Sequence, residues 1–148
     1  MIRFALFGAG RIGRVHADSI DVHSRAELAW VYDPIESAAL EVAGRYGAAT
    51  APTVDAAIDD PGVDAVVIAS ATPTHVDLLT RAVRAGKAVL CEKPIDLDLA
   101  RVDRCWTDIA ALNPTVLVGF NRRFDPSFRE VVFARDAAIR ACLGTNRD

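Results

Sequence analysis

The sequence has 148 residues, of which 51% are hydrophobic and 25% charged, and its net charge at pH 7 is −3. This length and composition are those of a single globular domain. The slightly negative charge, and the lack of a basic stripe with interleaved aromatic residues, argue against nucleic acid as a partner.

We expect neither a membrane-spanning protein nor one with a signal peptide. No hydrophobic run approaches the ~20 residues that span a bilayer, and the N-terminus lacks the apolar region and cleavage site of a signal peptide. We therefore expect no membrane partner.

The three cysteines (Cys91, Cys105 and Cys142) are odd in number and far apart. They predict reduced thiols in a cytoplasmic protein and no metal site.

The N-terminal stretch is the most informative. An apolar run over residues 2–7 leads directly into Gly8-Ala9-Gly10-Arg11-Ile12-Gly13, and a helical pattern over about 11–22 follows. In a phosphate-binding turn the first glycine lets the backbone reverse, the second leaves room for a pyrophosphate, and the third lets the helix pack closely on the strand. The N–H groups at the start of that helix then face the phosphates. The order strand, turn, helix therefore predicts a dinucleotide-binding site.

Strand-like and helical segments alternate along the rest of the chain. We predict strands over 27–32, 48–51, 63–69, 88–91 and 115–120, and helices over 34–46, 53–58, 75–85 and 97–112. This alternation predicts an α/β fold of the Rossmann type, with a doubly wound, mostly parallel six-stranded sheet. In the last helix we expect five core contacts: Leu97, Ala100, Trp106, Ile109 and Ala110.

Asp33 follows the second predicted strand and lies twenty residues after Gly13. At that distance an acidic side chain reaches the hydroxyls of the adenosine ribose and disfavours a 2′-phosphate. This interpretation predicts NAD rather than NADP. The alternative is that Asp33 only caps a helix that begins at Pro34.

Polar residues also follow the later strands. Because ligands of open α/β sheets bind at the carboxyl ends of strands, we expect the turns 70–75 and 92–94 to border the cofactor. Lys93 can hydrogen-bond a substrate hydroxyl and stabilise negative charge as its proton leaves; a solvated turn is the alternative. Thr74 is expected to cap the helix that begins at His75. Either Arg122 or Arg123 can clamp a ligand or lie on the surface, and His16 and His23 are interpreted as structural.

Taken together, these motifs resemble the Gfo/Idh/MocA family of sugar and polyol oxidoreductases, in particular its inositol 2-dehydrogenase branch. The resemblance covers residues 2–129. It implies that Gly8, Gly10, Ile12, Asp33, Thr72 and Glu92 contact NAD, and that Lys93 is catalytic as hydride passes from a ring carbon of a polyol or sugar to the nicotinamide. With the patterns above, the candidate cofactor-binding residues are Gly8, Gly10, Arg11, Ile12, Gly13, Asp33, Ser70, Thr72, Pro73, His75, Glu92, Lys93 and Arg122.

The family also carries a second α/β domain that supplies an Asp and a His base, and the sequence ends at Asp148 before such a region. We therefore expect residues 1–120 to form the dinucleotide-binding domain, and 121–148 a linker and the truncated start of the substrate domain. The chain is then a dehydrogenase that is catalytically incomplete as given, homo-oligomeric when full length, with an exposed apolar patch. The alternatives are a non-catalytic dinucleotide-binding module or truncated pseudo-enzyme, and a sugar dehydrogenase of the same family. Residues 131–139 are compatible with a strand or a helix.

Overall fold

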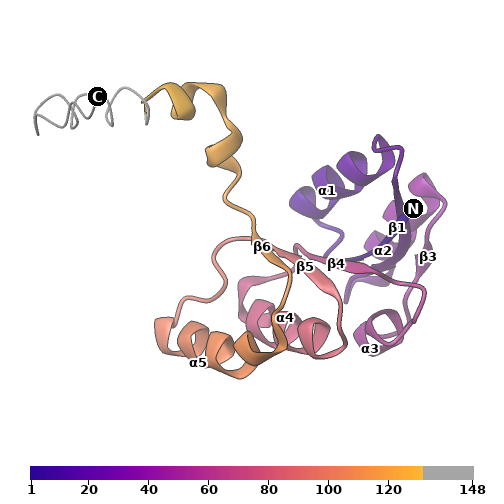
Figure 1. The fold of residues 1–148 in the computed structure, drawn as a ribbon. Helices are drawn as coiled ribbons and strands as arrows, with labels where there is room; N and C mark the ends of the chain where they lie inside the picture. The colour runs from indigo at the N-terminus through magenta and orange to yellow at the C-terminus, as the bar shows by residue number, and fades with distance from the viewer. Residues whose placement is uncertain (132–148) are drawn as a thin grey trace, which may run out of the picture.

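Six strands form one sheet in the computed structural model, which describes residues 1–131 (Figure 1). The strands are β1 (Ile2–Phe7), β2 (Ala26–Tyr32), β3 (Ala49–Thr50), β4 (Ala65–Ile68), β5 (Ala88–Cys91) and β6 (Val116–Val118). Their order across the sheet is β3-β2-β1-β4-β5-β6, and all neighbouring strands are parallel. The predicted Rossmann-type sheet is confirmed.

Five α-helices connect the strands: α1 (Arg11–Asp21), α2 (Glu36–Tyr46), α3 (Val54–Ile58), α4 (His75–Arg84) and α5 (Leu99–Ile109). Short 3₁₀ turns are η1 (Thr72–Thr74), η2 (Ala110–Leu112) and η3 (Asn121–Phe124). Figure 1 shows α1 on one side of the sheet and α4 and α5 on the other. None of the described helices is long and apolar enough to cross a membrane.

Alternate residues of the central strands enter two separate cores, because successive side chains of a strand point to opposite faces. Leu6 and Val67 pack with α1 and α2, whereas Phe7 and Ile68 pack with α3, α4 and α5. All four side chains are at most 3% exposed. The sheet is therefore covered on both faces along β1 and β4, the strands that meet at the centre.

The burial expected for the last helix is only partly correct. Ile109 is fully buried and Trp106 packs against the core, but Leu97 is 86% exposed, and Ala100 and Ala110 are exposed. The helix begins at Leu99, because Asp98 accepts a hydrogen bond from the Ala100 N–H and acts as the N-cap. Leu97 therefore lies outside the helix and outside the core.

Apolar side chains of β6 and of the residues that follow it are exposed. Leu117, Phe120 and Phe124 are 46%, 55% and 66% exposed. In Figure 1 the chain after β6 leaves the sheet and extends away from it. Residues 126–131 are helical. Of the segment 131–139, whose conformation the sequence left open, only residue 131 lies within the described part.

At the amino ends of the strands, Asp60 joins several elements of the fold. Asp60 accepts hydrogen bonds from Trp30 Nε1 in β2 and from the Gly62 N–H, both at 2.7 Å. Lys87, just before β5, donates to the carbonyl oxygens of Asp60 and Val63 at 2.9 and 2.8 Å. The hydrogen bond from Trp30, followed by that from Gly62, holds the pKa of Asp60 below its usual value.

We predict that Asp60 makes the folded state sensitive to acid. Because the pKa of Asp60 is lower in the folded than in the unfolded chain, its stabilising contribution is present at neutral pH and is lost as the pH falls through the folded-state value. Asp60→Asn should lower the Tm at pH 7 by a few degrees and flatten the loss of Tm on acidification, as followed by circular dichroism. The exposed neighbour provides the matched control, Asp59→Asn, which should keep the wild-type profile. An unchanged profile for Asp60→Asn would contradict this prediction.

Candidate cofactor site

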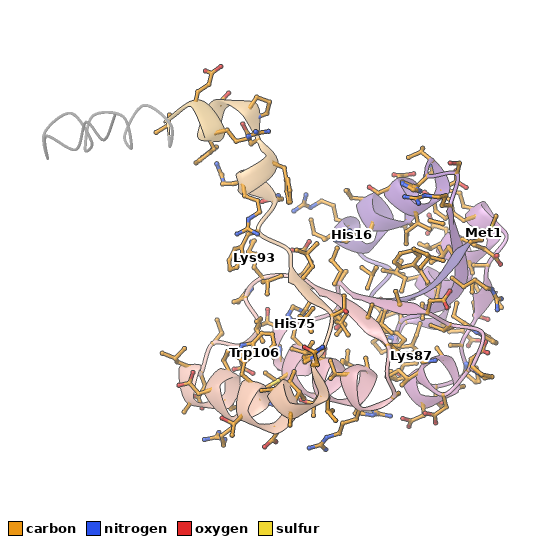
Figure 2. The ribbon with its side chains drawn as sticks, viewed as in Figure 1. Met1, His16, His75, Lys87, Lys93 and Trp106 are labelled. Carbon is orange, nitrogen blue, oxygen red and sulfur yellow. The ribbon has the colours of Figure 1, made fainter. Side chains whose placement is uncertain are left out.

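Four strands end in one row at the carboxyl edge of the sheet. Phe7 is in register with Tyr32 on one side and with Ile68 on the other, and Ile68 is in register with Cys91. The residues that come next in the chain are Gly8, Asp33, Ala69 and Glu92. In Figure 2, His75 and Lys93 lie toward this edge, whereas Met1 and Lys87 lie toward the opposite one. The parallel register therefore brings the predicted motifs together, although they are far apart in the sequence.

Two of the three turn glycines are required by the fold itself. Gly8 has a φ of +101°, and a Cβ on it would lie 2.5 Å from the carbonyl oxygen of Ala69 at the end of β4. A Cβ on Gly13 would lie 1.8 Å from the carbonyl oxygen of Gly8. These contacts are with backbone atoms, which cannot move aside as a flexible side chain can.

Gly10 is different, because nothing in the domain requires it to be a glycine. Its φ and ψ are −73° and −169°, which any residue can adopt, and a Cβ would meet no atom within 4 Å. Gly10 is the N-cap of α1, and no side chain caps that end of the helix. The first N–H groups of α1 therefore face an open space that a side chain at position 10 would enter. The next residues, Arg11 and Ile12, are exposed and half-buried.

Asp33 is tied to the glycine turn. Its Oδ2 accepts a hydrogen bond from the Ala9 N–H at 2.7 Å, and its Oδ1 accepts one from the Ile35 N–H at 2.9 Å. The interpretation of Asp33 as a helix cap is wrong, because α2 begins at Glu36 with Ile35 as its N-cap. The bond to Ile35 holds Pro34 and Ile35 in a turn and delays the helix.

A cavity of about 490 Å³ opens beside Asp33. The ends of β2 and β3 and the start of α2 form its walls, which include Tyr32, Pro34, Thr50 and Pro52. The cavity therefore continues from the carboxylate at the end of β2, on the side away from β1.

In the turn after β4, hydroxyl groups hold the backbone. Thr74 Oγ1 donates to the Ala71 carbonyl oxygen and lies 2.7 Å from Ser70 Oγ. Thr74 is the N-cap residue of α4 as expected, but its side chain makes no capping hydrogen bond, because the 3₁₀ turn η1 precedes the helix and the Thr74 hydroxyl binds within that turn. Thr72 is half-buried and Pro73 is exposed on this turn.

His75 supports this turn from the interior. Its ring is 2% exposed, Nε2 lies 3.0 Å from the Ser70 carbonyl oxygen, and Nδ1 lies 2.8 Å from the Pro94 carbonyl oxygen. Both ring nitrogens are thus occupied by backbone groups of two turns. The geometry places His75 behind the carboxyl edge and links the turn after β4 to the turn after β5.

The turn after β5 is joined to α1 by a second histidine. Glu92 Oε1 lies 2.8 Å from His16 Nε2, and the two side chains are 18% and 20% exposed. The same carboxylate packs under Gly119, where a Cβ would lie 2.9 Å from Glu92 Cδ. The structural interpretation of His16 agrees with this contact, but its link to Glu92, 76 residues away, was not predicted.

Lys93 and Arg122 differ in their surroundings. Lys93 is exposed, and within residues 1–131 its ammonium makes no hydrogen bond or ion pair. Its peptide bond with Pro94 is cis. Arg122 lies in η3, where its guanidinium is 4.5 Å from the centre of the Phe128 ring. No hydrogen bond or ion pair in the described part of the chain joins Arg122 to the glycine turn.

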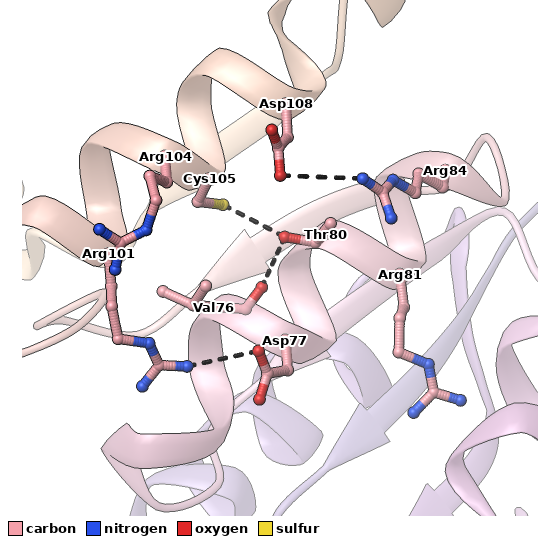
Figure 3. Close-up of a pocket in the computed structure, with 9 residues that line it drawn as sticks. All are labelled: Val76, Asp77, Thr80, Arg81, Arg84, Arg101, Arg104, Cys105 and Asp108. Atoms are coloured by element: carbon pink, nitrogen blue, oxygen red, sulfur yellow. Dashed lines mark hydrogen bonds and ion pairs between the residues drawn. The ribbon is translucent and has the colours of Figure 1, made fainter.

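A separate groove of about 470 Å³ lies between α4 and α5 (Figure 3). Four arginines line it: Arg81, Arg84, Arg101 and Arg104. Three of them form ion pairs: Arg81 with Asp55, Arg84 with Asp108, and Arg101 with Asp77. We interpret these pairs as contacts between helices, because they join α4 to α3 and α5. Within the described residues, no group of His, Cys, Asp or Glu is arranged to hold a metal ion.

The glycine turn, the carboxylate at the end of β2 and the strand order together define a dinucleotide-binding Rossmann domain. The comparison with known families agrees: residues 2–120 match the family model described as an oxidoreductase family with an NAD-binding Rossmann fold. The chain belongs to this family, the Gfo/Idh/MocA oxidoreductases, and residues 2–120 form its NAD-binding Rossmann domain.

Similar proteins include several inositol dehydrogenases. The chain is 48% identical over 135 residues to the inositol 2-dehydrogenase of Rhizobium meliloti, and it covers 41% of that protein. A crystal structure of a myo-inositol dehydrogenase from Corynebacterium glutamicum is 46% identical, with a TM-score of 0.84 over 93% of this chain and 41% of the other. The scyllo-inositol dehydrogenase of Lactobacillus casei, solved with NAD(H) and scyllo-inositol, is 29% identical with a TM-score of 0.86 over the same shares. The chain thus spans about two fifths of the length of these relatives.

The two described cysteines, Cys91 and Cys105, are free and buried, and Cys142 lies outside the described residues. Cys91 ends β5, directly before Glu92, and burial raises the pKa of its thiol to about 12.

We therefore predict that Cys91 is chemically protected although it adjoins the candidate site. In a Cys142→Ser variant, a chromogenic disulfide reagent at pH 8 should react with the native protein at least ~10²-fold more slowly than with a small thiol, because the thiolate is the reactive species. Two thiols per chain should react at once in guanidinium chloride. Rapid modification of Cys91 in the native protein would contradict its burial, and Cys91→Ala assigns the signal.

Proposed function

We propose that residues 1–120 form the cofactor domain of an NAD-dependent dehydrogenase that acts on a ring hydroxyl of a cyclic polyol. The observation that carries the proposal is the open space at Gly10, where the uncapped end of α1 faces a position that the fold itself leaves unfilled. A pyrophosphate fits this space in size and charge, because it accepts hydrogen bonds from helix N–H groups and is favoured by the helix dipole.

Asp33 would bind the adenosine ribose. Each of its oxygens accepts one backbone hydrogen bond, so each keeps a further lone pair for a ribose hydroxyl. The adjoining cavity of about 490 Å³ then accommodates the adenine. A 2′-phosphate would bring a second negative charge against the Asp33 carboxylate, which favours NAD over NADP.

The turns after β4 and β5 would hold the nicotinamide half of the cofactor, which supplies the hydride acceptor when bound. Ser70, Thr72 and Pro73 lie on the first turn, and Glu92 and Lys93 on the second. Because its ammonium has no partner within the described residues, Lys93 is able to hydrogen-bond the reacting hydroxyl and stabilise negative charge as the proton leaves. We propose Lys93 as the catalytic residue of this domain.

We do not assign the proton acceptor to a described histidine, because each has a ring nitrogen in contact with another group of the domain. His16 is bound to Glu92, both nitrogens of His75 contact carbonyl oxygens, and His23 accepts a hydrogen bond from the Arg25 N–H after α1. This observation favours a second candidate function, a dinucleotide-binding module without turnover of its own. In either case residues 121–148 would be a linker toward a substrate domain, and the exposed side chains beside β6 would pack in an oligomer or against that domain.

We predict that Gly10→Ala loses cofactor binding without loss of stability. The added methyl group meets no protein atom but enters the proposed pyrophosphate position, so the NADH affinity should fall by ~10-fold or more, equivalent to about 1.4 kcal/mol, with an unchanged Tm. Gly44→Ala, at another position where a Cβ meets nothing, is the matched control and should bind as wild type. Gly13→Ala should lower the Tm. Calorimetric titration and thermal unfolding measure both properties.

The same titration tests the choice of cofactor. NADH should bind the wild type at least ~10-fold more tightly than NADPH, and Asp33→Asn should reduce that ratio because the like-charge repulsion is removed. Absence of NADH binding by the folded wild type would contradict the proposed function. A preference for NADPH would contradict only the role of Asp33.

The catalytic proposal is testable in a chimera. Residues 1–120 would replace the corresponding part of the inositol 2-dehydrogenase of Rhizobium meliloti, the 48% identical relative. We expect the chimera to oxidise myo-inositol with NAD, and Lys93→Met in it to reduce kcat by ~10² or more with an unchanged Kd for NADH. A chimera that binds NADH, is folded and does not turn over would support the non-catalytic module; full activity of Lys93→Met would exclude Lys93 as catalytic.

A further inference from the structure

His75 presents a mismatch of hydrogen-bonding groups. The residue begins α4 and is 2% exposed, and its two ring nitrogens lie 2.8 Å from the Pro94 carbonyl oxygen and 3.0 Å from the Ser70 carbonyl oxygen. A carbonyl oxygen can only accept a hydrogen bond. A neutral imidazole has one N–H and one bare nitrogen, whereas an imidazolium has two N–H groups. Two such acceptors therefore match only the doubly protonated ring.

A neutral ring would be unfavourable at this position. Its bare nitrogen would point a lone pair at a carbonyl oxygen, and that buried contact would lack a proton to share. Because the ring is shielded from solvent, water does not replace the missing donor in the described structure. The cost of burying a cation must then be offset by a nearby negative charge.

Asp96 provides that charge. Its side chain is 8% exposed; Oδ1 accepts a hydrogen bond from the Asp98 N–H, and Oδ2 lies 2.9 Å from Arg101 Nη1. Within the described residues Oδ2 accepts no hydrogen bond. The hydrogen bond from Asp98, followed by the charge of Arg101 and then that of His75, holds the pKa of Asp96 below its usual value. The carboxylate is thus held in its ionised form, and we assign to it the charge that balances the His75 ring.

The other charged groups around His75 are already engaged or point away. Arg101 of α5 is shared between Asp96 and Asp77 of α4. On the β5 side, Glu92 is bound to His16 and Lys93 is exposed. Asp96 is itself paired with Arg101, but its Oδ2 accepts no hydrogen bond among the described residues, so we assign to it the charge that balances His75.

We propose that His75 is a doubly protonated positioning residue, whose imidazolium donates to the Ser70 and Pro94 carbonyl oxygens and holds the turns after β4 and β5 at a fixed separation. The consequence for binding rests on the proposed function, in which Thr72 on the first turn and Lys93 on the second face the nicotinamide and the reacting hydroxyl. Loss of one proton from His75 releases one turn and loosens the nicotinamide half of the site.

The charge state is measurable without any ligand. The chain has three histidines, so ¹⁵N-histidine labelling gives a simple spectrum in which His16→Gln and His23→Gln identify the remaining signals. At pH 7 both His75 nitrogens should show the shifts and attached protons of an imidazolium. One protonated and one bare nitrogen at pH 7 would overturn the proposal.

The positioning role is tested by removing the counter-charge. Asp96→Asn leaves the His75 ring in place, so we expect His75 to lose a proton at pH 7 and the NADH affinity to fall by ~10-fold. Asp103→Asn, an exposed position on α5, is the matched control. If Asp96→Asn does not fold, the ¹⁵N spectrum of the wild type decides, since one bare His75 nitrogen at pH 7 overturns the proposal.

Failure of the proposed function and failure of the positioning role of His75 give different results. A wild type that binds no NADH while His75 shows two protonated nitrogens contradicts the proposed function and leaves the charge state of His75 established. NADH affinity that is equal in the wild type and in Asp96→Asn, although the ring has lost its proton, overturns the positioning role.

Discussion

The contact between Gly13 and the Gly8 carbonyl oxygen is the constraint on which the rest of the site depends. Without a Cβ at either position, the chain leaves β1, reverses and enters α1 within a few residues, and the turn can press against the end of β4 at Ala69. This close approach is possible only for glycine, since the neighbouring atoms belong to the backbone. It places the start of α1 at the centre of the sheet, between the two halves of the fold.

Once α1 is in that position, side chains from later strands attach to it. Asp33, just after β2, accepts a hydrogen bond from the Ala9 N–H of the turn, and Glu92, just after β5, binds His16 of α1. His75 then connects the turns after β4 and β5. These contacts join the carboxyl edge into one unit. They explain how a domain whose turns come from distant parts of the sequence can present a pre-formed surface to a cofactor.

The division of roles among the glycines separates folding from binding. Gly8 and Gly13 are dictated by contacts inside the domain, whereas a Cβ on Gly10 would meet no atom of the described residues, and we propose that the space there receives a ligand. A similar division applies to the charged residues. Asp60 and Lys87 hold the amino ends of the strands, where nothing is proposed to bind, while Asp33, Glu92 and Lys93 lie at the carboxyl edge. These contacts therefore stabilise the amino ends of the strands, whereas the proposed binding residues lie at the carboxyl ends.

Much of the fold and the core of the site were predictable from the sequence, because they depend on local patterns. The apolar run of β1, the glycine spacing and the position of Asp33 each lie within a few residues or at a characteristic interval, and the family resemblance that rests on them is confirmed. Local patterns failed where another hydrogen-bonding partner competes for a side chain. Asp33 and Thr74 have the composition of helix caps, but one binds the glycine turn and the other the backbone of its own turn.

Only the tertiary structure decided which residues meet. The exposure of Leu97 follows from the cap at Asp98, and the pairing of His16 with Glu92 joins residues 76 positions apart. The surroundings of His75 are likewise set by two carbonyl groups from different turns. The sequence by itself determined the order of the elements and the chemistry at their ends, because these are encoded in short stretches. Which side chains are buried, paired or left free was decided by the parallel register of the sheet, which brings those ends into contact.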